Sequence, residues 1–131
     1  MARILVIDDE KSIRGTLQEI LEYEGYEVEL ASSGPEGLEK FSGNNFDIVL
    51  CDIKMPEMDG LEATHRIRER EQTTGEHIPI IAMTAYAMKG DRERCLSAGM
   101  DGYVSKPIRQ KELFESIDGI VPVPALAAPT E

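Results

Sequence analysis

Five short apolar runs recur along the chain, and the segments between them have a different periodicity. The runs are continuous or alternate with polar residues, which is typical of β-strands. They cover residues 4–7, 26–30, 48–51, 78–83 and 103–105. In the intervening segments apolar residues recur three or four positions apart, as on one face of a helix. The pattern therefore predicts strands and helices in strict alternation.

The intervening segments predict five helices. They are expected at residues 11–24, from about 33 to 43, at 58–71, in a segment that follows residues 84–86 and carries Met88, Cys95 and Leu96, and around Leu113, Phe114, Ile117 and Ile120. Gly25 directly after the first helix is a typical C-cap. The second half of the third helix is rich in Arg and Glu and is predicted to be solvated.

Alternating strands and helices predict a parallel sheet with helices on both faces and right-handed crossovers. A single domain, residues 1 to 121, accounts for all of these elements. From residue 122 the composition changes to a Pro- and Ala-rich segment that offers little to bury. Residues 122–131 are therefore predicted to be a loose tail or an interdomain linker.

Composition narrows the range of partners. The chain of 131 residues has a formal net charge of −11, which argues against direct binding of nucleic acid and favours a basic partner surface or a divalent cation. No apolar run has membrane-spanning length and no signal peptide precedes the first strand, so we expect a cytoplasmic protein without membrane contact. Cys51 and Cys95 lack metal-ligand spacing and are predicted to be reduced and buried. His65 and His77 are predicted to lie on the surface.

The run of residues 48–51 is continuously apolar, as expected of a central strand buried on both faces. Asp52 follows it directly, and Asp59-Gly60 then predicts a turn. In open α/β sheets the carboxyl ends of the strands form the edge at which ligands bind. Taken alone, Asp52 is better explained as a strand-end or helix-capping residue.

Four predicted strands end in groups that can take part in chemistry. Asp8 and Asp9 follow the first strand, Asp52 the third, Thr84 the fourth and Lys106 the fifth. If the first and third strands are neighbours, three carboxylates converge. Like charges about 4 Å apart repel by roughly 4 kcal/mol at an effective dielectric constant near 20, so the group would take up a proton or a divalent cation. Oxygen ligands favour Mg²⁺ over Zn²⁺.

These groups suit phosphoryl transfer. Carboxylates, a cation, the Lys106 ammonium and the Thr84 hydroxyl would neutralise charge around a nucleophile, and Asp52 is the candidate that would form an aspartyl phosphate. Each member also has a structural explanation. Asp8 and Asp9 are typical of a helix N-terminus, Thr84 of an N-cap, and Lys106 of an exposed turn. Their joint occurrence at four strand exits favours the functional interpretation.

With these residues in place, the chain strongly resembles the receiver domain of two-component response regulators over residues 1 to about 121. The resemblance implies a flavodoxin-like (βα)5 fold, doubly wound, with strand order 2-1-3-4-5. The motifs that carry it are Val6-Ile7-Asp8-Asp9-Glu10, Asp52 with Met55-Pro56 and Met58-Asp59-Gly60, Thr84-Ala85, and Gly102-Tyr103-Val104-Ser105-Lys106-Pro107.

The resemblance assigns an acceptor and a metal site. It implies that Asp52 accepts a phosphoryl group from a phosphohistidine on a histidine kinase or histidine phosphotransfer domain. Asp9, the Asp52 carboxylate and the backbone carbonyl of Lys54 would bind Mg²⁺ directly, and Asp8 would assist through water. Mn²⁺ is expected to substitute for Mg²⁺.

The resemblance also assigns a switch. Lys106 would pair with the phosphoryl group, and its peptide bond to Pro107 is expected to be cis. Thr84 would move to bind a phosphoryl oxygen, and Tyr103 would turn inward behind it. The output surface would be the fourth helix, fifth strand and fifth helix, which could also support a homodimer. Lys54 and Tyr86 occupy positions that tune dephosphorylation.

The resemblance implies a signalling module that assists its own phosphorylation and dephosphorylation, and not a conventional enzyme. Residues 11–26 resemble receivers of transcriptional activators. Residues 78–91 resemble receivers attached to hybrid histidine kinases, and the tail suits a linker to a further domain.

Three other functions remain to be weighed. A phosphatase with an aspartate nucleophile would need a second aspartate two residues after Asp52, where this chain has Lys54. A flavin-binding domain of the same topology would need a phosphate-binding first loop, and Asp8 and Asp9 would repel that phosphate. A docking module that is never phosphorylated is the third alternative, and the complete acidic set argues against it.

Overall fold

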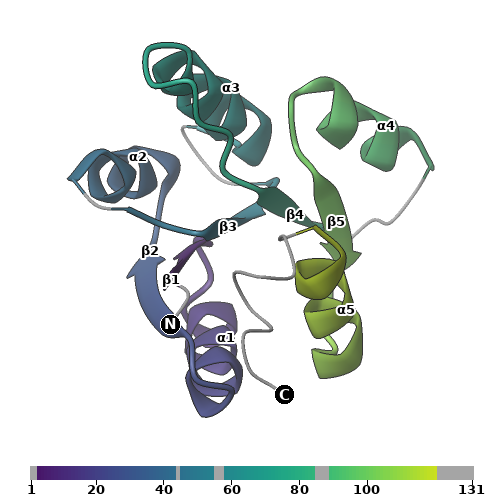
Figure 1. Ribbon diagram of the computed structural model, residues 1–131. Helices are drawn as coiled ribbons and strands as arrows, with labels where there is room; N and C mark the ends of the chain where they lie inside the picture. Colours follow the sequence, from purple (N-terminus) through teal and green to yellow (C-terminus); the bar gives the residue numbers. More distant parts are fainter. Residues whose placement is uncertain (1–2, 44, 55–57, 85–88, 121–131) are drawn as a thin grey trace.

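A computed structural model describes residues 3–43, 45–54, 58–84 and 89–120, in which five strands and five helices alternate (Figure 1). Each helix follows one strand, as the hydrophobic pattern predicts. The elements are β1 (Arg3–Ile7), α1 (Lys11–Tyr23), β2 (Glu27–Ala31), α2 (Gly34–Gly43), β3 (Ile48–Asp52), α3 (Gly60–Glu71), β4 (Ile80–Thr84), α4 (Lys89–Ser97), β5 (Gly102–Ser105) and α5 (Gln110–Ile120).

The strands form one parallel sheet in the order β2-β1-β3-β4-β5. This confirms the order implied by the resemblance and makes β1 and β3 neighbours. Their register pairs Ile4 with Ile48 and Ile7 with Cys51. The residue after Ile7 and the residue after Cys51 therefore leave the sheet side by side.

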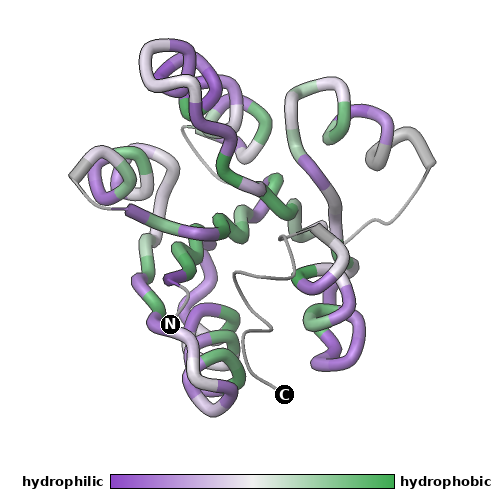
Figure 2. Tube along the Cα trace, viewed as in Figure 1, coloured by the Kyte–Doolittle hydropathy of each residue, from purple (hydrophilic) through white to green (hydrophobic). Residues whose placement is uncertain are grey.

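Two hydrophobic clusters lie on opposite faces of the sheet. Successive strand residues point to opposite faces, so Leu5 packs in one cluster and Val6 in the other. The first cluster includes residues of α2, α3 and α4, and the second includes residues of α1 and α5, so helices cover both faces (Figure 1). Figure 2 shows the strands as a largely hydrophobic centre.

Several element boundaries differ from the predicted ones. The helix α3 begins at Gly60 and not at residue 58, because the Asp59 side chain caps it by accepting a hydrogen bond from the backbone N–H of Glu62 at 2.8 Å. Gly25 has φ of 96°, which confirms the predicted C-terminal signal of α1. Leu96 in α4 is exposed, whereas Cys95 beside it is buried. Met88 and the tail lie outside the described residues.

The prediction of a solvated second half of α3 is wrong for Arg68 and Glu71. The Arg68 guanidinium directs all five of its N–H donors to protein oxygens: Nε and Nη2 to the Gly99 carbonyl, Nη2 also to Asp101 Oδ2, and Nη1 to Glu71 Oε1 and the Ile78 carbonyl. Only 17% of the Arg68 side chain is exposed, and Glu71 is buried. We call Arg68, Glu71 and Asp101 the Arg68 cluster.

The histidines and cysteines lie as predicted. His65 and His77 are exposed, and His77 Nε2 lies 2.7 Å from Asp101 Oδ1 at the border of the Arg68 cluster. Cys51 and Cys95 are both buried and neither forms a disulfide, and burial beside Asp52 raises the pKa of the Cys51 thiol far above its ordinary value. Both thiols therefore act as core residues. Within the described ranges, none of the helices has the length and apolarity needed to cross a lipid bilayer.

Candidate functional site

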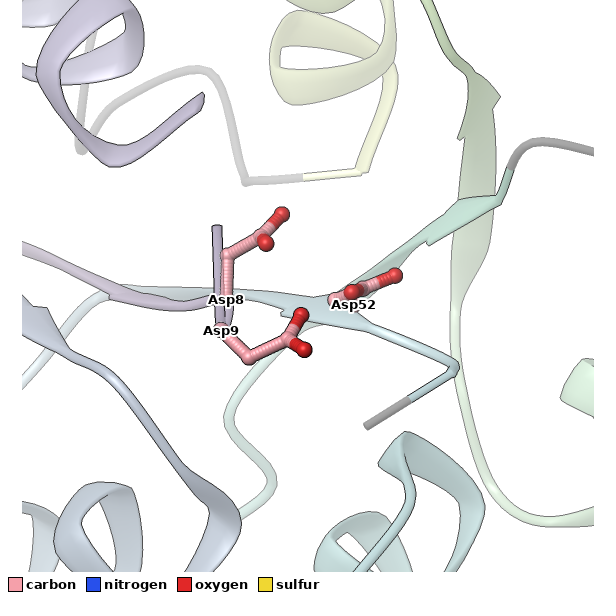
Figure 3. A group of neighbouring side chains, drawn as sticks. All are labelled: Asp8, Asp9 and Asp52. Carbon is pink, nitrogen blue, oxygen red and sulfur yellow. The ribbon is translucent and has the colours of Figure 1, made fainter. Parts of the chain in front are cut away.

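Three carboxylates meet where β1 and β3 end. Because Ile7 pairs with Cys51, Asp8 and Asp52 emerge beside each other, and Asp9 follows directly. Oxygen atoms of the three side chains lie within 4.8 Å of one another, and Figure 3 shows them grouped at this edge of the sheet. We call Asp8, Asp9 and Asp52 the acidic edge. The convergence predicted from the strand exits is therefore present.

Two of the three carboxylates of the acidic edge are buried. Asp8 is fully buried and only 4% of Asp52 is exposed, whereas Asp9 faces solvent. Asp8 Oδ1 accepts a hydrogen bond from the backbone N–H of Glu10 at 2.9 Å. Asp8 Oδ2 is buried and, among the described residues, has no partner with hydrogen-bond geometry. A buried carboxylate oxygen in that state favours a cation nearby.

Lys106 supplies one such cation. It follows β5, its backbone N–H donates to the Thr84 carbonyl at 2.7 Å, and its peptide bond to Pro107 is cis, as the resemblance implied. Its Nζ lies 3.0 Å from Asp8 Oδ2 and 3.3 Å from Asp52 Oδ1. The Asp8 distance is that of an ion pair, even though the angles fall short of a directed hydrogen bond. One ammonium thus faces both buried carboxylates.

Glu10 is a site residue that sequence reasoning missed. Its Oε1 lies 3.3 Å from Lys106 Nζ and accepts a hydrogen bond from it. The sequence placed Glu10 in the motif beside Asp8 and Asp9, but nothing in the strand periodicity indicated that its side chain reaches across to the end of β5. A third carboxylate therefore shares the single lysine.

The pKa shifts express the excess of negative charge. Burial, and then the charge of Asp8, raise the pKa of Asp52 to about 7, with the Lys106 ammonium acting in the opposite direction. Burial lowers the pKa of Lys106, but its contact with Asp8 and the charge of Asp52 outweigh that effect, so the net shift is upward. Near neutral pH, Asp52 is therefore only partly ionised unless further positive charge arrives.

The donor set fits a hard divalent cation such as Mg²⁺. The available ligands are carboxylate oxygens from Asp8, Asp9 and Asp52, which are the ligand type that Mg²⁺ prefers. The sharing of one lysine among Asp8, Asp52 and Glu10 and the raised pKa of Asp52 both indicate that negative charge is in excess at this edge. The resemblance adds the backbone carbonyl of Lys54, which lies two residues beyond Asp52 with its side chain exposed.

The remaining predicted residues lie on the neighbouring strands. Thr84 is the buried last residue of β4, opposite Ser105 in the register with β5, so it lies at the same edge as the carboxylates. Tyr103 is half-buried in β5 and packs against the hydrophobic cluster that includes α2, α3 and α4. The N-cap of α1 is Glu10, so neither Asp8 nor Asp9 caps that helix.

The N-terminus of α3 packs tightly against the end of β3. The Gly60 N–H donates to the Ile53 carbonyl at 2.8 Å. A Cβ at position 60 would collide with the Asp52 carbonyl oxygen and lie 2.9 Å from the Ile53 Cα. Glycine is therefore required for this close approach. Met55 and Pro56 lie outside the described residues.

Comparison with known proteins gives a consistent family. A family model described as the response regulator receiver domain matches residues 4–118. The chain is 41% identical over 121 residues to hybrid signal transduction histidine kinase I of Dictyostelium discoideum, covering 88% of this chain and 7% of that protein. It is 40% identical over 112 residues to response regulator MprA of Mycobacterium sp. (strain KMS), covering 86% of this chain and 47% of that protein. The chain thus spans less than half the length of these relatives.

Solved structures agree with the topology. The chemotaxis protein CheY4 of Vibrio cholerae has a TM-score of 0.86 at 30% identity, covering 92% of this chain and 99% of that chain. The receiver domain of sensor histidine kinase PA1611 from Pseudomonas aeruginosa PAO1 has a TM-score of 0.81 at 35% identity, covering 91% and 96%, and its structure has a magnesium ion coordinated in the active site cleft.

Proposed function

Because the chain belongs to the response regulator receiver domain family of two-component signalling, we propose that Asp52 is its phosphoacceptor and that a phosphohistidine is the donor. The observation that carries the proposal is the acidic edge itself. Three carboxylates have oxygens within 4.8 Å of one another, and the Lys106 ammonium lies against the two buried ones. The donor belongs to a histidine kinase or a histidine phosphotransfer domain.

The chemistry is a phosphoryl exchange between two side chains. An ionised Asp52 oxygen attacks the phosphorus atom, a phosphorus–oxygen bond forms, and the phosphorus–nitrogen bond breaks with its electron pair passing to the leaving imidazole. Water later attacks the same phosphorus, the bond between phosphorus and the Asp52 oxygen breaks, and inorganic phosphate leaves as the carboxylate is regenerated. Lys106 lies where it can balance charge on the transferred group.

The metal part of the proposal concerns Mg²⁺, with Mn²⁺ as a substitute. Asp9, Asp52 and the Lys54 backbone carbonyl would hold it directly, and Asp8 would act through water. When bound, the ion would neutralise the crowded carboxylates and the incoming phosphoryl oxygens. Asp52 would then be ionised at neutral pH and available as a nucleophile, which the raised pKa of the metal-free site otherwise opposes.

The response proposed for the domain is a change in the surface formed by α4, β5 and α5. Thr84 would bind a phosphoryl oxygen and Tyr103 would turn inward. Tyr103 lines an open hollow between β5 and α5 together with Glu112 and Ser116. A partner bound at this hollow would contact Tyr103 and so respond to the orientation of its side chain. A homodimer through this surface is part of the proposal, as is tuning of the phosphoryl lifetime at Lys54.

The surroundings of the domain are proposed as well. The match covers 7% of a hybrid kinase and 47% of a response regulator, so we propose that the domain acts as a receiver within a larger signalling protein. A domain at residues 1–121 with a linker at 122–131 remains a prediction. Direct binding of nucleic acid is not expected at a net charge of −11. The two cysteines that form no disulfide support a cytoplasmic location.

Mass spectrometry after incubation with acetyl phosphate and Mg²⁺ tests the acceptor. We expect the wild-type chain to gain one phosphoryl group and Asp52→Asn to gain none. Asp59→Asn is the matched control, because asparagine caps helices as well as aspartate and Asp59 is exposed. A phosphoryl gain that survives Asp52→Asn would refute the assignment. No gain in the wild-type chain would favour the unphosphorylated docking module.

A further inference from the structure

The Lys106 ammonium has three carboxylate neighbours and three N–H donors. Asp8 lies at 3.0 Å, Asp52 at 3.3 Å and Glu10 at 3.3 Å. An ammonium group has three donors and no acceptor. Glu10 accepts a directed hydrogen bond from Lys106, and Asp8 and Asp52 lie at ion-pair distance from it. Only 12% of the Lys106 side chain is exposed. An incoming phosphoryl oxygen therefore competes with these three carboxylates for the ammonium.

Burial decides which contact is released. Asp8 is fully buried, and separating it from Lys106 would leave a charged oxygen with no hydrogen-bond partner among the described residues. Asp52 carries the phosphoryl group and so brings it to the lysine. Glu10 has 58% of its side chain exposed, so water can replace the lysine at little cost. Glu10 is therefore the partner that is exchanged most easily.

Glu10 is an unusual residue for the place it holds in the fold. It is the N-cap of α1, with extended backbone (φ −93°, ψ 119°), but its side chain makes no capping hydrogen bond. Short side chains such as Ser, Asp and Asn are favoured there because they can reach the first helical N–H groups. The long side chain of Glu10 instead reaches Lys106. Its backbone is fixed on both sides, because its N–H donates to Asp8 and its carbonyl accepts from Arg14.

We propose that Glu10 is a positioning residue, which holds Lys106 in the unphosphorylated domain and competes with the phosphoryl group for its ammonium. The proposal rests on phosphorylation of Asp52. The ion pair from the start of α1 to the end of β5 occupies the lysine before phosphorylation and is released as the phosphoryl group arrives. Glu10 thereby slows phosphorylation and keeps Lys106 close to the acceptor.

The rate of phosphorylation by acetyl phosphate with Mg²⁺ tests the competition. Glu10→Gln keeps the length of the side chain and removes its charge. We expect the second-order rate constant to rise roughly two- to fivefold, because that factor corresponds to the interaction free energy of an exposed ion pair. Glu19→Gln removes the same charge from an exposed position of α1 and should change the rate little. Measurement at about 0.5 M salt screens long-range repulsion of the anionic donor, so the expected increase should persist there.

Coupling to the lysine separates positioning from a general charge effect. In a Lys106→Gln background, Glu10→Gln should no longer accelerate phosphorylation at high salt. In the unphosphorylated, Mg²⁺-free protein, the ¹⁵N resonance of the Lys106 ammonium should shift in Glu10→Gln and stay in place in Glu19→Gln. An equal acceleration in both lysine backgrounds, an increase abolished by salt, or an unmoved Lys106 resonance would overturn the proposal.

The two proposals fail in different ways. If the wild-type chain gains no phosphoryl group on Asp52, the proposed function and this inference fall together. If Asp52 is phosphorylated and Glu10→Gln reacts at the wild-type rate or more slowly, only the role of Glu10 is refuted.

Discussion

Two polar clusters at opposite ends of the sheet use similar side chains in opposite ways. The Arg68 cluster lies at the amino ends of β4 and β5, where Asp101 Oδ2 accepts a hydrogen bond from the Ile80 N–H at 2.9 Å. The acidic edge lies at the carboxyl ends of β1 and β3. Each cluster combines largely buried carboxylates with one basic side chain. They differ in how completely these groups are satisfied.

The Arg68 cluster is satisfied in full. All five guanidinium donors are used, and Glu71 Oε2 accepts from the Ile78 N–H at 2.5 Å. At the acidic edge the Lys106 ammonium is shared by Asp8, Asp52 and the neighbouring Glu10, and Asp8 Oδ2 has no directed hydrogen bond among the described residues. A satisfied cluster holds elements together, whereas an unsatisfied one is ready to bind what it lacks.

Removing the basic side chain of the Arg68 cluster should have the largest effect on stability. Arg68→Met leaves Glu71 and Asp101 without their cation, so we expect the free energy of unfolding to fall by about 2–4 kcal/mol. Chemical denaturation measures the change. Arg66→Met is the control, because Arg66 forms an exposed pair with Glu62 and should alter stability by less than about 0.5 kcal/mol. Equal losses in the two variants would show that the Arg68 cluster is not a structural unit.

Added Mg²⁺ should stabilise the protein through the acidic edge and not through the Arg68 cluster. If the ion binds at the acidic edge as proposed, it should stabilise the folded chain by about 2.7 kcal/mol at a hundredfold excess over the dissociation constant. Asp9→Asn should abolish most of that response. Asp101→Asn should lower stability without Mg²⁺ and retain the full response to the ion, because Asp101 belongs to the other cluster. A melting temperature that millimolar Mg²⁺ leaves unchanged in the wild-type chain would contradict the metal site.

A smaller increase in the free energy of unfolding is expected from Asp52→Asn when a chelator removes divalent cations. The folded pKa of Asp52, about 7, lies above its ordinary value of 3.8, so its ionised form opposes folding. This penalty begins as the pH rises above about 4 and is complete above about 7. Lys106 has a raised pKa, so its stabilising contribution is constant over that range.

Asp52→Asn should therefore stabilise the metal-free chain by roughly 1–2 kcal/mol at pH 8 and much less at pH 5. Asparagine deprives Lys106 of one carboxylate, which keeps the gain below the full linkage value. Urea unfolding of both proteins at the two pH values gives the comparison. A gain that does not depend on pH, or a loss of stability at pH 8, would show that the acidic edge is not strained.

The sequence predicted most of the fold because its strands are short and apolar. Continuous runs such as residues 48–51 identify strands buried on both faces, and their alternation with helical periodicity predicts a parallel sheet. The strand order came from the family resemblance, since periodicity does not say which strands are neighbours. Once β1 and β3 are adjacent, the meeting of Asp8 with Asp52 follows from their register.

The sequence did not predict contacts made by long side chains. Glu10 reaches Lys106 across 96 residues, and no local pattern encodes that distance. Arg68 and Glu71 resembled a solvated stretch because charged residues fill that half of α3. A signal was present, since Glu71 lies four residues after Ile67 and seven after Thr64, on the buried side of the helix. Position on the helix therefore predicts burial better than residue type does when a charged side chain has buried partners.

The fit of Gly60 against the Asp52 carbonyl has a consequence for anyone who diversifies this chain in the laboratory. Even an alanine at that position would push the start of α3 away from the tip of β3 and tilt the aspartate that ends the strand. Random libraries should keep position 60 fixed. Variants that are inactive because of a steric clash at this position would otherwise be mistaken for changes in signalling.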